Sequence, residues 1–333
     1  MDKIKVGVIG LGGVAQLVHL PNLNKLPNVE ISAVAEVNRN RLHTISDKFK
    51  IDHRFSNYKD LLEKSEVDAV IIATPTNTHK DIAIDCLQAG KDILVEKPLA
   101  RTYLEAKQVY DVAKKTKRKL MVGMNLRYRP DAMLIRSMLT ANEIGDPFYV
   151  KCGWIRQQSS SEKWFTKKEE SGGGVIIDLG IHLLDLVLWL LGYPEVTSVA
   201  TTNFHHRTKS VEDTSISCIK CKNSAVINLE VSWSLPVQKD HFFFDVYGTK
   251  GSFSSNPFRL YKKIENDYIN LTPTQIDNPS ILLKKSYLNE LKSFLGAIKG
   301  LNPVFSSGEE AVHRMKVVEA MYESATKKHE IKL

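Results

Sequence analysis

The chain has 333 residues, of which 43% are hydrophobic and 25% are charged, an ordinary balance for a folded globular protein. Its length predicts two domains, each large enough for its own hydrophobic core. The longest apolar run, residues 183–191, is about half of what a membrane span needs and contains Asp185. The first residues lack the pattern of a signal peptide. We therefore expect a cytoplasmic protein without a membrane segment.

The net charge of +8 raises nucleic acid as a partner. The basic residues are spread along the chain, and the one dense run, residues 114–119, falls at the end of a predicted helix. Cations at that end complement the helix dipole, which explains the run without a ligand. No recognition motif accompanies the charge, so nucleic-acid binding is the weaker alternative and we expect no such partner.

The chain contains 4 cysteines, which are too few and too scattered for a disulfide framework. Cys218 and Cys221 match a redox or zinc half-site in spacing, but no second pair of this kind exists. They lie in an alternating strand pattern, where residues three apart point to opposite faces. We expect a structural role and no metal site.

The first third of the chain alternates short apolar strands with amphipathic helices, which predicts a parallel sheet covered on both faces. The predicted strands are residues 3–9, 29–35, 69–73, 93–95 and 120–124, and the predicted helices begin near residues 14, 39, 58, 79 and 102.

The pattern changes after Asn125. A helix over 130–139 and a strand over 148–154 lead to a polar loop and an apolar helix that starts at Asp178 and ends at Gly192. From Val196 to Tyr261 the pattern predicts antiparallel strands, and two helices close the chain. Ser307 and Glu310 form a capping box for the last helix. We assign residues 1–124 to one domain and 125–333 to another.

The first strand runs into Gly10-x-Gly12-x-x-Ala15 and then into a helix, the pattern of a dinucleotide-binding turn. Gly10 would make the turn, Gly12 would let a pyrophosphate approach the backbone, and the helix N-terminus would bind the phosphates. Glu36 ends the next strand, where a carboxylate binds a ribose diol and repels a 2′-phosphate. This favours NAD over NADP, although two nearby arginines, Arg39 and Arg41, keep NADP as the alternative.

Three polar groups stand in the apolar helix: Asp178, His182 and Asp185 are spaced i, i+4 and i+7, so they share one helical face. Buried charges are costly unless they are paired. The three residues are therefore either a satisfied polar stripe or part of a functional site.

Three further segments identify a family. "ATPTNTH" (73–79) and "GKDILVEKPLA" (90–100) follow strands of the first domain, and "SGGGVIIDLGIHLLDLVLWLLG" (171–192) begins the apolar helix. Together with the glycine turn they resemble the Gfo/Idh/MocA oxidoreductases along nearly the whole chain. The resemblance implies an N-terminal Rossmann domain, doubly wound around a parallel sheet, and a second domain with an open, mostly antiparallel sheet. The outer face of that sheet often forms the interface of a homodimer or homotetramer. The cofactor-binding residues implied by the resemblance and the turn are Gly10, Gly12, Gly13, Val14, Glu36, Thr74, Pro75, Asn77, His79, Glu96 and Lys97.

The resemblance also implies the reaction, hydride transfer between NAD and a ring hydroxyl or ketone of a sugar, a sugar derivative or an inositol-like polyol. Lys97 would stand beside the nicotinamide and stabilise a developing alkoxide, with Pro98 in the cis form. His182 would accept the alcohol proton, and Asp178 would hold a substrate hydroxyl or relay protons. We expect this helix face to meet Lys97 at a cleft between the domains, and Asp185 to be structural.

Further substrate contacts are expected where the chain leaves the first domain and in the loop before the glycines. These candidates are Asn125, Arg127, Arg156 and Trp164 with its neighbour Phe165. Two other functions remain open. One is a glycosidase that uses NAD transiently, and the other is a non-catalytic regulator that senses a dinucleotide, although regulators of that kind tend to lose the lysine and the histidine.

Overall fold

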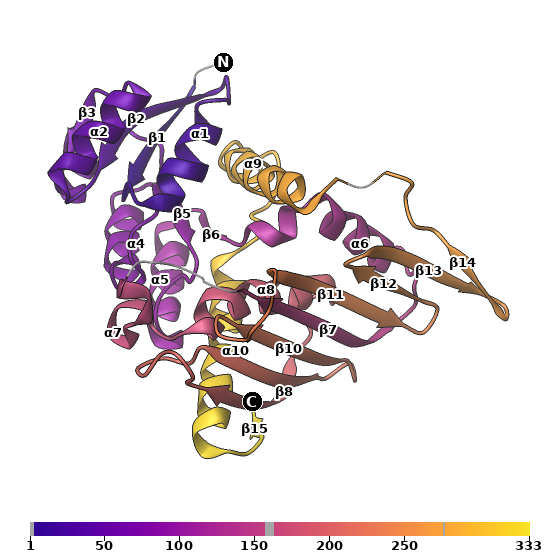
Figure 1. Ribbon diagram of the computed structural model, residues 1–333. Coiled ribbons are helices and arrows are strands. Elements are labelled where there is room, and N and C mark those ends of the chain that lie inside the picture. The colour runs from indigo at the N-terminus through magenta and orange to yellow at the C-terminus, as the bar shows by residue number, and fades with distance from the viewer. Residues whose placement is uncertain (1–2, 157–162, 276) are drawn as a thin grey trace. The chain divides into compact units, whose positions relative to one another are not determined.

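The computed structural model describes residues 3–156, 163–275 and 277–333 (Figure 1). The chain divides into two compact units. The first consists of residues 1–124 and 287–313, and the second of residues 125–286 and 314–333. The first unit thus includes a stretch from the C-terminal third of the chain.

The first unit contains a six-stranded sheet in which every neighbouring pair is parallel, in the order β3-β2-β1-β4-β5-β6. This is the doubly wound order of a Rossmann fold, which confirms the predicted fold of this half. The strand β3 is an addition to the predicted set. The strands are β1 (Ile4–Ile9), β2 (Val29–Ala35), β3 (His53–Phe55), β4 (Ala69–Ile72), β5 (Asp92–Glu96) and β6 (Leu120–Gly123).

Three helices of this unit begin at a polar side chain that caps them. Asn38, Asn57 and Thr102 each accept a hydrogen bond from a backbone N–H of the first turn of α2, α3 and α5. The central strand β4 is fully buried, as a parallel strand covered on both faces must be. The helical elements are η1 (Ala15–His19), α1 (Leu20–Leu23), α2 (Arg39–Phe49), α3 (Tyr58–Lys64), η2 (Thr76–Thr78), α4 (His79–Gln88) and α5 (Tyr103–Thr116).

The second unit is built on a nine-stranded open sheet in the order β14-β13-β12-β11-β7-β10-β9-β8-β15. Only β7 and β10 pair in parallel, and the other neighbours are antiparallel, as predicted. The strands are β7 (Pro147–Ile155), β8 (Val196–Phe204), β9 (Thr214–Cys221), β10 (Val226–Ser232), β11 (His241–Gly248), β12 (Gly251–Ser255), β13 (Phe258–Ile264), β14 (Asp267–Asn270) and β15 (Ile331–Lys332).

One helix of the second unit is almost entirely buried. Helix α8 (Ile181–Leu190) is apolar except for His182 and Asp185, and all of its residues but His182 are buried, so it lies inside the fold against β7 and β10. The helical stretch Lys168–Leu190 is long and apolar enough to cross a membrane, but 94% of its most apolar window is buried, which identifies it as a core helix. The predicted α-helix is not continuous, because the turn that holds Asp178 is a π-helix, η5 (Ile176–Gly180).

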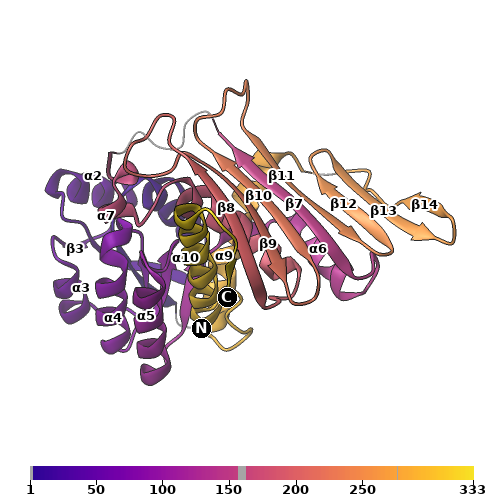
Figure 2. The same cartoon turned by 90° about the horizontal axis from the view of Figure 1, so that it is seen from below.

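The remaining helices are η3 (Asn125–Tyr128), α6 (Pro130–Thr140), η4 (Lys163–Thr166), α7 (Lys168–Ser171), α9 (Pro279–Ile298) and α10 (Gly308–Lys327). Figure 2 shows the strands of the open sheet from a second direction. The capping box is confirmed: the Ser307 N–H donates to Glu310 Oε2 at 3.0 Å, and the Glu310 N–H donates to Ser307 Oγ at 3.2 Å.

The two cysteines of the CxxC pair lie on β9, with Cys221 buried and Cys218 partly exposed, so they face opposite sides of the sheet as predicted. Among the residues that the structure describes, no group of three metal-ligating side chains comes together.

Candidate active site

The glycine turn after β1 has the geometry of a dinucleotide-binding loop. Gly10 has a φ of +89°, and a Cβ there would lie 2.6 Å from the Ala73 carbonyl oxygen, so only glycine fits. A Cβ at Gly12 or Gly13 would meet no described atom within 4 Å. Packing inside the protein therefore does not require glycine at these two positions. The space above the loop is what a closely approaching ligand needs.

Glu36 lies beside this turn, just beyond β2, and is 7% exposed. Its Oε2 accepts a hydrogen bond of 2.9 Å from the Leu11 N–H, and its Oε1 accepts one of 2.9 Å from the Asn38 N–H. Arg41 Nη1 is 3.4 Å from Oε2. The carboxylate thus braces the turn while standing where a ribose diol binds in Rossmann folds.

His79 connects the ends of two neighbouring strands. Its Nδ1 is 2.7 Å from the Pro98 carbonyl oxygen, and its Nε2 is 2.8 Å from that of Thr74. Burial lowers the pKa of His79, against the opposing effect of these two carbonyl groups. A neutral ring donates only one of the two hydrogen bonds. The ring lies within hydrogen-bond distance of one carbonyl oxygen from the segment after β4 and one from the segment after β5. Of the other predicted cofactor residues there, Thr74 is partly buried, whereas Pro75 and Asn77 are exposed.

Glu96 ends β5 and pairs with a histidine that follows the glycine turn. His19 Nε2 is 2.7 Å from Glu96 Oε1, and the two side chains are only 1% and 13% exposed. Burial by itself would raise the pKa of Glu96, but the hydrogen bond and charge of His19, with the charges of Lys97 and His79, lower it. The next residue, the partly buried Lys97, precedes Pro98 through a cis peptide bond, as predicted. The chain thus places a lysine at the C-terminal end of a parallel strand, the edge where nucleotides bind in open α/β sheets.

In the second unit, Asp178 and His182 each contact an aromatic side chain of the sheet. Trp233 Nε1 donates a hydrogen bond of 3.1 Å to Asp178 Oδ2, and Asp178 is 8% exposed. The ring centroids of Trp154 and the partly exposed His182 are 6.0 Å apart. Carboxylate and imidazole therefore come from one helical segment and rest on indoles of the open sheet.

The glycines before this segment make room for a buried acid. A Cβ on Gly173 would lie 2.0 Å from the Tyr322 hydroxyl, and one on Gly174 would lie 2.0 Å from the Glu212 carbonyl oxygen. Glu212 accepts hydrogen bonds from the backbone N–H groups of Gly174 and Ile176 and from the Tyr322 hydroxyl. Burial raises the pKa of Glu212, and these donors oppose the rise. Glu212 thus anchors the start of the segment that carries Asp178.

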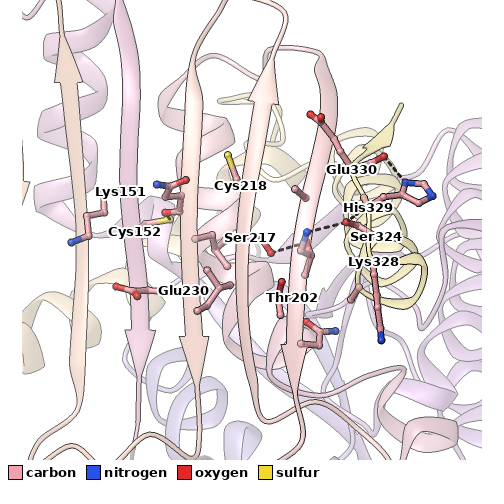
Figure 3. Close-up of a pocket in the computed structure, with 17 residues that line it drawn as sticks. Lys151, Cys152, Thr202, Ser217, Cys218, Glu230, Ser324, Lys328, His329 and Glu330 are labelled. Carbon is pink, nitrogen blue, oxygen red and sulfur yellow. Dashed lines mark hydrogen bonds between the residues drawn. The ribbon is translucent and has the colours of Figure 1, made fainter.

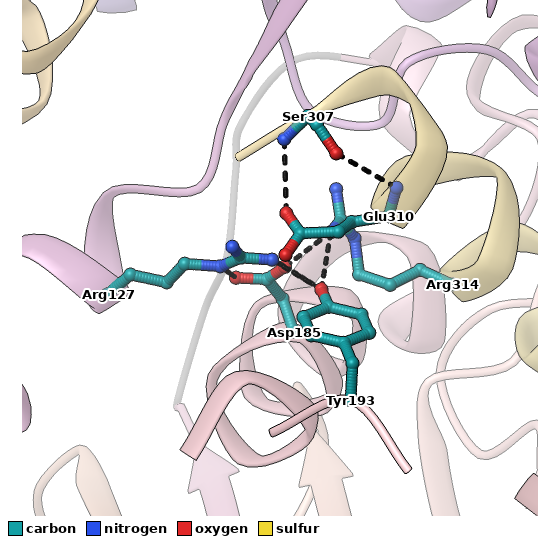
Figure 4. A network of polar contacts seen from close by, with 6 residues as sticks. All are labelled: Arg127, Asp185, Tyr193, Ser307, Glu310 and Arg314. Carbon is teal, nitrogen blue, oxygen red and sulfur yellow. Dashed lines mark hydrogen bonds and ion pairs between the residues drawn. The ribbon is translucent and has the colours of Figure 1, made fainter. Parts of the chain in front are cut away.

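Asp185 lies in a separate polar cluster (Figure 4). Arg127 donates to both of its carboxylate oxygens at 2.6 Å, and the two side chains are each 1% exposed. Arg314 Nη1 lies 2.5 Å from Asp185 Oδ1 and donates a hydrogen bond of 2.7 Å to the Tyr193 hydroxyl. Two guanidinium groups thus enclose one carboxylate, which agrees with the structural role expected for Asp185.

The other predicted substrate residues are more scattered. Asn125 is 3% exposed, and its Nδ2 donates a hydrogen bond of 3.0 Å to Ser286 Oγ. Arg156 is paired with Asp240 at 3.1 Å, and its side chain is 32% exposed. Trp164 is partly buried, while the side chain of Phe165 and the loop over 157–162 lie outside the described part of the structure.

The partners that hold the predicted groups were not themselves predicted, and Glu212, His19 and Trp233 are examples. Glu212 is one of two adjacent acids before an apolar strand, a signal that could have marked a buried carboxylate. His19 and Trp233 carry no comparable signal, because their partners are 77 and 55 residues away in the chain.

Comparison with known proteins agrees with both halves of the chain. Residues 4–124 match the family model of an oxidoreductase family with an NAD-binding Rossmann fold. Residues 136–333 match the model of the C-terminal alpha/beta domain of the same oxidoreductase family. The two models together cover most of the chain, including the glycine turn, Lys97 and the Asp178–His182 segment.

Individual relatives extend over similar lengths. A D-glucoside 3-dehydrogenase of Escherichia coli (strain K12) is 25% identical over 97% of this chain and 96% of its own. A scyllo-inositol 2-dehydrogenase (NAD(+)) of Bacillus subtilis (strain 168) is 32% identical over 75% of this chain and 73% of its own. The solved structure of a levoglucosan dehydrogenase in complex with NADH and levoglucosan has a TM-score of 0.89 at 22% identity, over 99% of each chain, and so shares the fold. The chain belongs to the Gfo/Idh/MocA family of NAD-dependent oxidoreductases.

Proposed function

We propose that this protein is a dehydrogenase that transfers a hydride between NAD and a ring hydroxyl or ketone of a sugar, a sugar derivative or a cyclic polyol. One observation carries the proposal. A chain with an NAD-binding Rossmann domain retains both Lys97, at the end of β5, and the Asp178–His182 pair on a helical segment of the second unit. Relatives named as glucoside and inositol dehydrogenases support this substrate class.

The residues around the glycine turn fit a dinucleotide. The open space over Gly12 and Gly13 would accept the pyrophosphate, and Glu36 would accept hydrogen bonds from the ribose hydroxyl groups. A bound NAD would supply the hydride acceptor. Glu36 is ionisable and mostly enclosed, so a 2′-phosphate beside it would suffer charge repulsion. NAD is therefore the expected cofactor rather than NADP, and we propose that Val14, Thr74, Pro75, Asn77, His79 and Glu96 complete its site.

Three side chains would share the chemistry of alcohol oxidation. The ammonium of Lys97 stabilises negative charge as it develops on the substrate oxygen. His182 accepts the hydroxyl proton, since an imidazole titrates near neutral pH. Asp178, held by Trp233, accepts a hydrogen bond from a substrate hydroxyl and fixes the sugar ring.

The proposed substrate site does not use every predicted arginine. Both carboxylate oxygens of Asp185 already accept hydrogen bonds from the guanidinium of Arg127, so we assign Arg127 a structural role at the start of the second domain. Asn125, Arg156 and Trp164 remain proposed substrate contacts. In functional terms, residues 1–124 are the proposed cofactor domain and 125–333 the proposed substrate domain, with residues 287–313 packed on the former.

The test is a panel of sugars, sugar phosphates and inositols, assayed for reduction of NAD⁺ and, in parallel, of NADP⁺. We expect at least one ring polyol to reduce NAD⁺, with a higher kcat/KM than with NADP⁺. Cleavage of a chromogenic glycoside without net formation of NADH would instead identify a glycosidase. Binding of NAD without turnover of any compound of either panel would favour a regulator.

We also propose that the open face of the nine-stranded sheet is the interface of a cytoplasmic homodimer or homotetramer. This face contains a hollow of about 660 Å³, whose lining includes Lys151, Glu230 and Cys218 (Figure 3). Ile216 and Tyr247 on the same face are 52% and 38% exposed. Light scattering after size exclusion should show that Ile216→Lys lowers the molar mass, whereas Leu301→Lys, a substitution at an exposed leucine of the first unit, leaves it unchanged. A monomeric wild-type protein would contradict this assignment.

A further inference from the structure

The carboxylate proposed to bind the substrate is held by a tryptophan. The indole Nε1 of Trp233 donates a hydrogen bond of 3.1 Å to Asp178 Oδ2. Trp233 and Asp178 are 7% and 8% exposed, so water competes little for this contact. The two residues are 55 positions apart: Trp233 directly follows β10, and Asp178 lies in the π-helical turn η5.

Hydrogen bonds next to β9 and β10 fix the backbone that carries this indole. The Trp233 N–H donates a hydrogen bond of 2.8 Å to the Asp213 carbonyl oxygen, just before β9. The next residue, Ser234, donates its hydroxyl to Asp213 Oδ1 at 2.8 Å and its N–H to Ser232 Oγ at 3.0 Å. These hydrogen bonds fix the backbone that carries the indole, and the hydrogen bond from Nε1 to Asp178 then joins the side chain to η5.

The Asp178 segment is anchored separately. Glu212, which directly precedes Asp213, accepts the N–H groups of Gly174 and Ile176 at the start of the segment that contains Asp178. The same short stretch before β9 thus holds the backbone of Asp178 through Glu212 and positions Trp233 through Asp213. The backbone near Asp178 and the backbone of Trp233 are thus both hydrogen-bonded to the two residues that precede β9.

An indole N–H is only a donor, so this contact needs Oδ2 as an acceptor and restricts the orientation of the plane of the carboxylate. A carboxylate that must receive one particular hydroxyl of a sugar ring depends on that plane, because an error of about 1 Å in a reacting group can lower the rate by about a hundredfold. Phenylalanine in place of Trp233 would keep most of the apolar packing but remove the donor.

We propose that Trp233 is a positioning residue, which acts through its indole N–H to orient Asp178 for the substrate hydroxyl. This inference rests on the proposed function, in which Asp178 binds the substrate. Hydrogen bonds to charged groups are among the stronger ones, so Trp233→Phe should lower kcat/KM for the polyol found in the panel by about ten- to a hundredfold. Binding of NAD should not change.

The test is a double-mutant cycle: kcat/KM is measured, in the presence of NAD⁺, for the wild type, Trp233→Phe, Asp178→Asn and the double variant. If Trp233 acts through Asp178, adding Trp233→Phe to the Asp178→Asn variant should change kcat/KM by less than about twofold. Trp189→Phe is the matched control, since Trp189 is also mostly buried, at 9% exposure, but lies on α8 against Arg136. It should leave kcat/KM unchanged.

A second readout does not need turnover. The chain has 4 tryptophans, so the indole N–H resonances of isotope-labelled protein can be assigned by single substitutions. The resonance lost in Trp233→Phe should be the one that shifts most in Asp178→Asn. The inference would be overturned if Trp233→Phe had the wild-type kcat/KM, or if the Trp233 resonance did not shift in Asp178→Asn. It would also be overturned if the double variant lost kcat/KM by the full product of the two single losses. Full activity in Asp178→Asn with a shifted resonance would instead contradict the proposed role of Asp178.

Discussion

Gly174 is the position where the structure allows the sharpest stability prediction. An added Cβ would lie 2.0 Å from the Glu212 carbonyl oxygen and 2.9 Å from the Glu212 nitrogen. Carbon and oxygen atoms that are not bonded stay at least about 3 Å apart, so the two backbone segments must separate by about 1 Å. The same carbonyl oxygen accepts the Val175 N–H at 3.0 Å, and this hydrogen bond would be lost or stretched.

The expected cost of Gly174→Ala follows from these two effects. Overpacking a well-packed site costs about 1–3 kcal/mol, and a lost hydrogen bond adds about 1 kcal/mol. A total of about 3 kcal/mol in the free energy of unfolding corresponds to a fall of roughly 6–12 °C in the Tm of a domain of this size. Asp178 follows four residues later, so turnover should fall as well.

Gly180→Ala is the matched control in the same segment. A Cβ there would lie 3.6 Å from Val231 Cγ2 and 3.7 Å from Ile176 Cγ2, which are ordinary contacts, and Gly180 has helical φ and ψ angles. Replacing a helical glycine by alanine stabilises by about 0.5–1 kcal/mol, so the Tm should rise by about 2 °C. Differential scanning calorimetry of both variants is the assay. Equal Tm values for Gly174→Ala and Gly180→Ala would refute the packing described for Glu212.

Two further predictions concern the first unit. Glu36→Gln removes the negative charge beside the proposed ribose site, so the ratio of kcat/KM for NAD⁺ to that for NADP⁺ should fall by at least about tenfold. Glu30→Gln, at an exposed position of β2, should leave this ratio unchanged. An unaltered ratio in Glu36→Gln would speak against the cofactor assignment. Burial lowers the pKa of His79, so the unfolded chain binds the proton more readily, and the free energy of unfolding should decrease as the pH falls below about 6.5, the ordinary pKa of histidine. Urea unfolding of His79→Gln should show a weaker decrease over that range than the wild type or the exposed control His43→Gln, and identical pH dependence in all three proteins would contradict the burial argument.

The sequence predicted the architecture well where local patterns decide it. The strands β1, β2, β4, β5 and β6 lie at the predicted places, because continuous apolar runs between polar turns have few alternatives. The strand β3 has only 3 residues and no buried side chain, so its pattern carries no such signal. The π-helical turn η5 was also not predicted, since π-turns depend on how a helix packs rather than on its period.

The candidate site divides in the same way. Gly10, Glu36 and Lys97 follow from a turn and from strand ends, so their local surroundings could be predicted from spacing. Hydrogen-bond partners that come from distant elements could not be predicted from spacing. Asp178 was expected beside His182 on a regular α-helix, but its carboxylate accepts a hydrogen bond from Trp233 of the sheet, a contact that only the tertiary fold creates. The ion pair between Arg127 and Asp185 spans 58 residues and is likewise invisible to a local pattern.

The most direct test of the proposed chemistry is a measurement of NADH formation with Lys97→Ala and His182→Ala, together with calorimetric titration of each variant with NAD⁺. Lys97→Ala removes the group that stabilises charge and His182→Ala the group that accepts the proton, so each variant should lower kcat by at least about a hundredfold. The Kd for NAD⁺ should stay within about threefold of the wild type. Lys299→Ala and His43→Ala, at exposed positions, should behave as the wild type. Wild-type turnover in both Lys97→Ala and His182→Ala would contradict the account.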